Sequence, residues 1–359
     1  MSEIRGVWIA NRPHSKVLES PNNITEAMDF LQSYGFNLIF PVVWNRGYTL
    51  YPSRVMRQYN LPAIEPYYQQ QQRDPLGEII TAAHQRKIKV IPWLEYGFAA
   101  SHLVTGGHIL QQYPHWQAID KDGATVRHGG LTWMNAFNPQ VQQFMLEIIK
   151  EIVSTYDVDG IQGCDRLPAL PVTAGYDSDT IRQYQTEFKQ QPPRNYHDRQ
   201  WVQWRADLLT GFLSKMYREV KAIKPQAIIS LSPAVYPFCL NNLLQDSLAW
   251  VEQGLCDLIH PQLYRPSFSG YHHEVKQLIK SFDRSSLTKF APGIALTANG
   301  KDLTTKDIIK CIKTNRDRHL SGQVFFHYEG LRKNNDAVAI ALSKSAGYNR
   351  IATLPEYLG

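Results

Sequence analysis

The chain has 359 residues and a mass of 41.2 kDa, with 43% hydrophobic and 19% charged residues. Lysine and arginine exceed aspartate and glutamate by 38 to 32, and this balance, without a dense basic run, does not indicate a nucleic acid partner. The longest apolar runs, such as 36–43, have the length of strands and not of membrane spans. Composition therefore excludes fibrous, disordered, membrane-spanning and disulfide-scaffold proteins. It predicts a large soluble globular protein, rich in tryptophan and tyrosine.

In chain order, short apolar segments rich in β-branched residues alternate with longer amphipathic segments. Each short segment predicts a strand and each longer one a helix. The predicted strand and helix pairs are 6–10 and 24–34, 37–43 and 75–87, 89–96 and 141–156, 160–165 and 200–223, 227–232 and 243–253, 258–264 and 274–283, 291–297 and 305–318, and 323–328 and 336–344.

A strand followed by a helix, eight times over, is typical of a parallel sheet of the α/β class. Eight units favour a closed (β/α)8 TIM barrel over an open sheet, and no GxGxxG follows the first strand to indicate a dinucleotide site. A bare barrel needs about 250 residues, so we expect the surplus of roughly 100 in long βα loops after strands three and four, at 97–138 and 166–199. We predict one barrel domain over 1–345, with a C-terminal tail, 346–359, packed on or beside it.

The four cysteines are widely spaced and form no CxxC pair, so a zinc site or redox motif is disfavoured and reduced thiols are expected. They are Cys164, Cys239, Cys256 and Cys311. The histidines show no HxH or HExxH pattern, so we predict no metal and no other cofactor. Because 1–9 already has the pattern of a folded strand, no signal peptide is indicated. We therefore expect a cytoplasmic protein, or an exported one if an export signal has been removed.

The active sites of (β/α)8 barrels are built at the carboxyl ends of the strands. Three acids fall there: Glu95 after strand three, Asp165 after strand four and Glu329 after strand eight. Two carboxyl groups can cleave a glycosidic bond, because one protonates the leaving oxygen while the other attacks or activates water. Their separation decides between retention and inversion, and the sequence leaves both open. Structural alternatives are an ion pair of Glu95 with a neighbouring arginine and an anchoring role of Glu329 in the last loop.

Aromatic rings, amides and guanidinium groups accompany these acids. Such groups suit a neutral polyhydroxylated ligand, because sugar rings stack on tryptophan and tyrosine while hydroxyl groups need donors and acceptors. We therefore predict a glycan or oligosaccharide as the substrate. The candidate substrate-binding residues are Arg12, Trp44, Asn45, Trp93, Asn135, Gln162, Cys164, Arg166, Tyr264 and Tyr328.

Several motifs occur in order along the chain. They include Arg5-Gly6-Val7-Trp8, Pro92-Trp93-Leu94-Glu95-Tyr96, Trp133-Met134-Asn135, Asp157-Val158-Asp159-Gly160-Ile161 and Pro261-Gln262-Leu263-Tyr264. Together they resemble the glycosyl hydrolase-like 10 family over about residues 4–335. The resemblance implies a bacterial (β/α)8 barrel of glycosidase type, with cell-wall glycan or another polysaccharide as the substrate.

One position departs from the pattern of that family. The family usually ends strand four with two adjacent acids, in a pattern like Asp-Gly-Ile-x-x-Asp-Asp, whereas residues 159–165 here read Asp-Gly-Ile-Gln-Gly-Cys-Asp. Cys164 thus stands in place of the first acid. Strand alternation puts Gln162 and Cys164 on one face, so if Gln162 points into the barrel the missing acid is the inward one.

Three hypotheses follow from this departure. The leading one is hydrolysis of O-glycosidic bonds in a polysaccharide or peptidoglycan-type glycan by Asp165 and Glu95, with Glu329 as an alternative partner. The second is a catalytically weakened, carbohydrate-binding pseudoenzyme. The third is a thiol nucleophile at Cys164, for which no neighbouring base is identifiable; a small buried cysteine is the plain structural interpretation.

Overall fold

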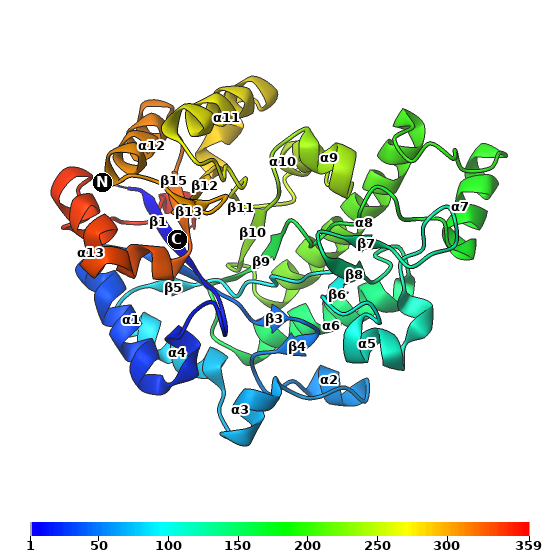
Figure 1. The fold of residues 1–359 in the computed structure, drawn as a ribbon, viewed down its shortest axis with the longest axis horizontal. Helices are drawn as coiled ribbons and strands as arrows, with labels where there is room; N and C mark the ends of the chain where they lie inside the picture. Colours follow the sequence, from blue (N-terminus) through cyan, green and yellow to red (C-terminus); the bar gives the residue numbers. More distant parts are fainter. Residues whose placement is uncertain (1, 359) are drawn as a thin grey trace.

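Eight parallel strands form the barrel around which the rest of the chain is arranged (Figure 1). The computed structural model describes residues 2–358. All residues of the longest strands are buried or nearly so, as expected for a parallel sheet covered by helices. The strands are β1 (Ile4–Ile9), β2 (Leu38–Pro41), β5 (Lys89–Val90), β9 (Gly160–Cys164), β10 (Ile228–Ser232), β11 (Leu258–Ile259), β12 (Gly293–Ala295) and β15 (Gly322–Phe326).

The barrel closes through two junctions between two groups of strands. One group has the order β12-β15-β1-β2-β5 and the other the order β11-β10-β9. At the first junction, between the segments of β5 and β9, Gln162 N–H donates to Pro92 O at 2.8 Å and Leu94 N–H donates to Gln162 O at 3.0 Å. At the second, between those of β11 and β12, Gly293 N–H donates to Pro261 O at 2.9 Å. The prediction of a (β/α)8 barrel is confirmed.

Two strands are shorter than their apolar patterns predict. The segments expected at 89–96 and 258–264 have regular strand structure only at Lys89–Val90 and Leu258–Ile259. Pro92 and Pro261 follow these strands and have no N–H group to donate to a neighbouring strand. Pairing beyond them therefore continues only as single bridges, such as that between Trp93 and Gln162.

Several helices on the outside of the barrel begin before the first residue predicted for them, for example at Pro21 in place of 24 and at Pro139 in place of 141, whereas those predicted from 75 and 305 begin at these residues. Their N-terminal N–H groups are capped by side-chain oxygens, among them those of Ser20, Asp74, Asn138, Asp198 and Ser267. The helices are α1 (Pro21–Ser33), α4 (Pro75–His84), α6 (Pro139–Thr155), α8 (Arg199–Ile223), α9 (Phe238–Leu243), α10 (Ser247–Glu252), α11 (Phe268–Ser281), α12 (Thr305–Asp317) and α13 (Tyr328–Ser345). None of the helices within 2–358 is long and apolar enough to span a membrane.

Two predicted helices differ from those observed. The helix expected at 243–253 is the pair α9 and α10, because Leu244 ends α9 in the left-handed region at φ +56°. The helix expected at 336–344 belongs to α13, which begins at Tyr328 and is interrupted by non-helical backbone from Lys333 to Asp336.

The remaining elements lie in the connections that follow the strands. Segment 97–138 contains the antiparallel sheet β6-β8-β7, and segment 166–199 contains one helix. Further elements follow β2 and β12, so the extra length is not confined to the two segments predicted. These elements are β3 (Trp44–Asn45), β4 (Tyr48–Thr49), α2 (Arg54–Gln58), α3 (Pro66–Gln70), β6 (Ala99–Ser101), α5 (Gly107–Gln112), β7 (Arg127–His128), β8 (Leu131–Trp133), α7 (Ser178–Phe188), β13 (Thr297–Ala298) and β14 (Lys301–Asp302).

The barrel interior contains a small polar network. Trp8 Nε1–H donates to Gln162 Oε1 at 2.6 Å, and Gln162 Nε2 donates to Ser230 Oγ at 2.9 Å. All three residues are fully buried, so their polar groups need these partners. Gln162 therefore points into the barrel, and strand alternation puts Cys164 on the same inward face.

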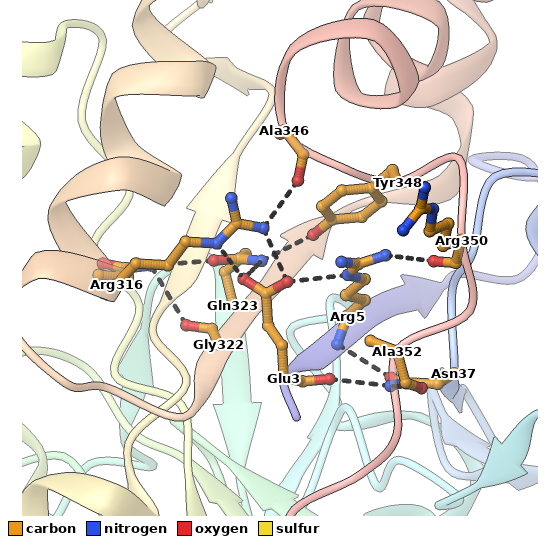
Figure 2. Close-up of polar contacts among 11 residues, drawn as sticks. Glu3, Arg5, Asn37, Arg316, Gly322, Gln323, Ala346, Tyr348, Arg350 and Ala352 are labelled. Atoms are coloured by element: carbon orange, nitrogen blue, oxygen red, sulfur yellow. Dashed lines mark hydrogen bonds and ion pairs between the residues drawn. The ribbon is translucent and has the colours of Figure 1, made fainter. Parts of the chain in front are cut away.

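A buried charge cluster joins the start of β1 to the C-terminal segment (Figure 2). Glu3 accepts hydrogen bonds from Arg5 Nε and from Arg316 Nε and Nη2, each at 2.8 Å. Arg5 Nη1 donates to Arg350 O at 2.7 Å, and the Arg5 guanidinium lies 4.3 Å from the centre of the Tyr348 ring. Burial alone would raise the pKa of Glu3, but the two arginines lower it below its ordinary value. The segment after α13 is thus held by the strand that begins the barrel.

Replacing Glu3 by glutamine should lower the free energy of unfolding at pH 7 by about 3 kcal/mol, because two arginines lose their counter-charge. A lowered carboxyl pKa stabilises the fold above the unfolded value and loses this effect as the pH falls through the folded value. Urea denaturation should therefore show the difference at pH 7 and a smaller one at pH 3. Asp179→Asn, which removes an exposed ion pair with Arg182, should cost under about 1 kcal/mol. An equal loss for Glu3→Gln at both pH values would contradict this interpretation.

Candidate active site

Two of the three predicted acids lie on either side of one arginine at the carboxyl ends of neighbouring strands. Arg166 Nη2 lies 3.9 Å from Glu95 Oε1, and Arg166 Nη1 lies 3.8 Å from Asp165 Oδ2. Arg166 Nε also donates to the backbone oxygen of Glu95 at 2.6 Å, which fixes the guanidinium. About a quarter of each side chain remains exposed: 20% for Glu95 and 27% for Asp165. The pair is therefore open to a ligand.

Glu95 has the environment of an acid that holds its proton. Burial raises the pKa of Glu95 above its ordinary value, and the charge of Asp165 acts in the same direction. Arg166 and a hydrogen bond from Asn45 Nδ2 to Glu95 Oε2 oppose this effect without cancelling it. A carboxyl group that stays protonated at higher pH than usual is suited to general acid catalysis.

Cys164 lies next to this pair, and its thiol is in an unreactive environment. Its side chain is buried, and Sγ lies 3.0 Å from the backbone oxygen of Glu95 and 3.4 Å from that of Leu94. Burial raises the pKa of the Cys164 thiol to about 12. The thiol is therefore protonated and donates to carbonyl oxygens, which argues against the hypothesis of a thiol nucleophile.

Aromatic side chains line the barrel interior beside the two acids. The Tyr264 ring stacks on Phe326 with centroids 5.1 Å apart, and Trp93 approaches Phe326 edge-on at 6.4 Å. Trp8 makes an edge contact with Tyr264 at 6.5 Å. Burial raises the pKa of Tyr264 well above its ordinary value, and the nearby charge of Asp165 adds to this effect. Tyr264 therefore keeps its hydroxyl proton next to the carboxylate.

Three of the predicted substrate-binding residues have structural partners instead of accessible surfaces. Trp44 is fully buried, and its Nε1–H donates to Gly97 O at 3.0 Å. Gln162 belongs to the interior network. Asn135 is buried and its side-chain oxygen accepts the N–H of Phe137 at 3.0 Å. The structure therefore places these three side chains beyond the reach of a sugar.

Two further predicted residues, Arg12 and Tyr328, have contacts within the protein. Arg12 is half-exposed, stacks on the Tyr67 ring at 3.7 Å and pairs with Glu19 at 3.2 Å. The Tyr328 hydroxyl accepts a hydrogen bond from Arg332 at 2.9 Å. Both side chains therefore have protein partners of their own.

Glu329, the third predicted acid, has a hydrogen-bond partner of its own outside the Arg166 pair. It lies in the first turn of α13, and its Oε1 accepts a hydrogen bond from Ser15 at 2.6 Å. It lines a surface pocket together with Lys16, Glu26 and Arg332. Within residues 2–358 its contacts are thus with the connection after β1 and with α1 and α13.

Two residues near Glu95, His14 and Arg46, were not among the predicted site residues. His14, in the connection after β1, acts electrostatically to lower the pKa of Glu95. Arg46 contacts Asn45, the residue that donates to Glu95. Both residues follow the carboxyl ends of strands, and this position is the sequence feature that points to them. No group of three or more metal-ligating side chains is found in the described part of the chain.

Comparison with known proteins gives the following similarities. The family described as glycosyl hydrolase-like 10 matches residues 3–291. The chain is 25% identical over 303 residues to glycosyl hydrolase DigH of Escherichia coli, an alignment that covers 73% of this chain and 66% of that protein. It is 24% identical over 295 residues to glycosyl hydrolase YngK of Bacillus subtilis, covering 73% and 54%. The chain thus spans about two thirds of the first relative and just over half of the second.

Two solved structures share the fold. One is the PgaB (BpsB) glycoside hydrolase domain from Bordetella bronchiseptica, with a TM-score of 0.68, 14% identity, and coverage of 94% of this chain and 98% of that one. The other is the catalytic domain of β-amylase from Paenibacillus polymyxa, with a TM-score of 0.65, 9% identity, and coverage of 96% and 98%. At these identities the likeness establishes the barrel architecture alone.

Because the Cys164 thiol is buried and protonated, it should resist alkylation in the folded protein. We expect iodoacetamide at pH 8 to label Cys164 at least a hundredfold more slowly in the native chain than in the chain unfolded in guanidinium chloride. Mass spectrometry of the peptide that contains Cys164 measures both rates. Labelling of the native chain as fast as that of the unfolded chain would show an accessible thiol and contradict the burial of Cys164.

Proposed function

Because the chain belongs to the glycosyl hydrolase-like 10 family, we propose that it hydrolyses O-glycosidic bonds of a polysaccharide or peptidoglycan-type glycan. Glu95 is the general acid and Asp165 the second carboxylate. The observation that carries the proposal is that both carboxyl groups lie against one guanidinium, while burial raises the pKa of Glu95.

The chemistry follows from the two different environments. Protonated Glu95 gives its proton to the glycosidic oxygen while the bond from that oxygen to the anomeric carbon breaks. Asp165 either attacks the anomeric carbon, or takes a proton from the water that attacks it. In both cases one water is consumed, its hydroxyl ends on the anomeric carbon, and its remaining proton restores the carboxyl groups.

Neighbouring groups support this assignment of roles. The charges of Asp165 and Glu95 raise the pKa of Arg166 despite its burial, so the guanidinium stays positive beside both acids. The partly exposed ring of Tyr264 supplies apolar surface near Asp165, which suits the C–H face of a sugar. The relatives named glycosyl hydrolases and the fold shared with glycoside hydrolase domains support the same reaction class.

Glu95→Gln and Asp165→Asn should each lower kcat by about 10² to 10⁴-fold, as expected when a general acid or its partner is removed. Release of reducing ends from peptidoglycan glycan strands and from chito-oligosaccharides measures turnover, and calorimetry with the same glycans should show that binding persists. Glu329→Gln is the comparison variant, because Glu329 is the alternative acid and bonds to Ser15. Unchanged rates in both test variants, or a loss confined to Glu329→Gln, would overturn the assignment.

A second candidate function is a carbohydrate-binding pseudoenzyme, favoured by Cys164 in the place where the family pattern has an inward acid. Cys164→Asp separates the two. The thiol now faces the backbone oxygens of Leu94 and Glu95, so a carboxylate there would meet acceptors in place of donors. We therefore expect Cys164→Asp to lower Tm and to leave turnover unchanged or reduced, as measured by thermal unfolding and reducing-end release. A large gain of turnover would instead favour the pseudoenzyme.

A further inference from the structure

The hairpin beside Glu95 has an arginine at a position where an arginine is unusual. Strands β3 and β4 pair Asn45 with Tyr48, so Arg46 and Gly47 form a two-residue turn. Both turn residues have left-handed backbone, at φ +52° and +78°. Turns of this type favour Asn-Gly, because a long side chain is strained in the left-handed region. Strain that persists at such a position is a reason to look at what the side chain does.

The Arg46 side chain connects a half-buried acid to the amide that contacts Glu95. Arg46 Nη2 pairs with Glu65 Oε1 at 3.1 Å, and Arg46 Nε–H donates to Asn45 Oδ1 at 2.9 Å. Asn45 Nδ2 in turn donates to Glu95 Oε2. The contacts therefore run in one line from Glu65 through Arg46 and Asn45 to the proposed acid.

We propose that Arg46 is a positioning residue, which holds the Asn45 amide so that its NH2 group, and not its oxygen, faces Glu95. An amide oxygen that accepts the Arg46 N–H leaves only the NH2 group for the other side. Glu95 Oε2 is then always an acceptor, so the transferable proton resides on Oε1. Oε1 lies 3.9 Å from Arg166 Nη2, beyond hydrogen-bonding distance, and is free to give its proton to the glycosidic oxygen.

This inference rests on the proposed function, because it assigns which oxygen of Glu95 carries the catalytic proton. If the amide turned over, Asn45 Oδ1 would accept the proton of Glu95 Oε2 and direct it away from the substrate. The amide would also no longer stabilise the carboxylate form of Glu95. Loss of Arg46 should therefore lower the rate of proton transfer and raise the pKa of Glu95 further.

Arg46→Lys and Arg46→Gly test the proposal. Lysine keeps the charge but lacks the fork that reaches two partners, and glycine suits the left-handed backbone, so both variants should fold. We expect kcat to fall about tenfold or more with KM within about threefold, and the alkaline limb of the kcat profile to move to higher pH. Arg57→Lys is the matched control, because Arg57 lies on α2 of the same connection, is exposed, and should leave all three quantities unchanged.

A titration separates this inference from the proposed reaction. Glutamate labelled with ¹³C at Cδ, with the Glu95 signal identified by its loss in Glu95→Gln, reports the protonation of Glu95 without any turnover. An upward shift of its pKa in both Arg46 variants supports the positioning role even if no glycan is cleaved. An unchanged titration and an unchanged pH profile in both variants overturn it, whether or not the wild-type protein hydrolyses glycans.

Discussion

The arrangement at the carboxyl ends of the strands depends on one guanidinium that faces two carboxyl groups. Arg166 supplies one positive charge, whereas Glu95 and Asp165 together would supply two negative charges. Like charges at a partly buried site oppose full ionisation, which favours the protonated form of the more buried group. Glu95 is that group, since burial is the largest influence on its pKa. The difference between the two acids thus follows from a charge balance that the barrel imposes.

Barrel closure is what brings Arg166 to Glu95. The segments of β5 and β9 form no regular ladder, because Pro92 interrupts it; they are joined by the bridge between Trp93 and Gln162 and by the hydrogen bond from Asp159 N–H to Val90 O at 2.9 Å. Just beyond this bridge, Gly97 allows the chain to approach Arg166: a Cβ atom at Gly97 would lie 2.1 Å from Arg166 O. The interior hydrogen bonds of Gln162 hold the other side of the same junction. The contacts that close the barrel between β5 and β9 therefore also determine how Arg166 and Glu95 lie relative to each other.

The sequence sufficed for the barrel and for the ends of its strands, because hydrophobic periodicity and strand-end position are local properties. It did not reveal which polar side chains already have partners. A side chain that binds a sugar cannot be told from a core residue by sequence pattern. Trp44 and Asn135, both predicted to bind the substrate, instead form hydrogen bonds with backbone groups. Arg46, although it follows strand two, was not among the predicted site residues for a related reason: its role depends on a left-handed turn that an Arg-Gly pair does not indicate. The partners that each polar side chain has in the folded chain could therefore not be predicted from the sequence.

Cys164 takes on a different meaning once the charges around Arg166 are counted. An ionised acid at this inward position would add a third negative charge beside one guanidinium and would face the backbone oxygens of Leu94 and Glu95. It would have to be protonated or to displace its neighbours. A thiol adds no charge and donates to those same oxygens. The cysteine therefore leaves a two-carboxyl site in which Glu95 and Asp165 need not share their single cation with another acid, and the departure from the family pattern is compatible with the proposed division of roles between them.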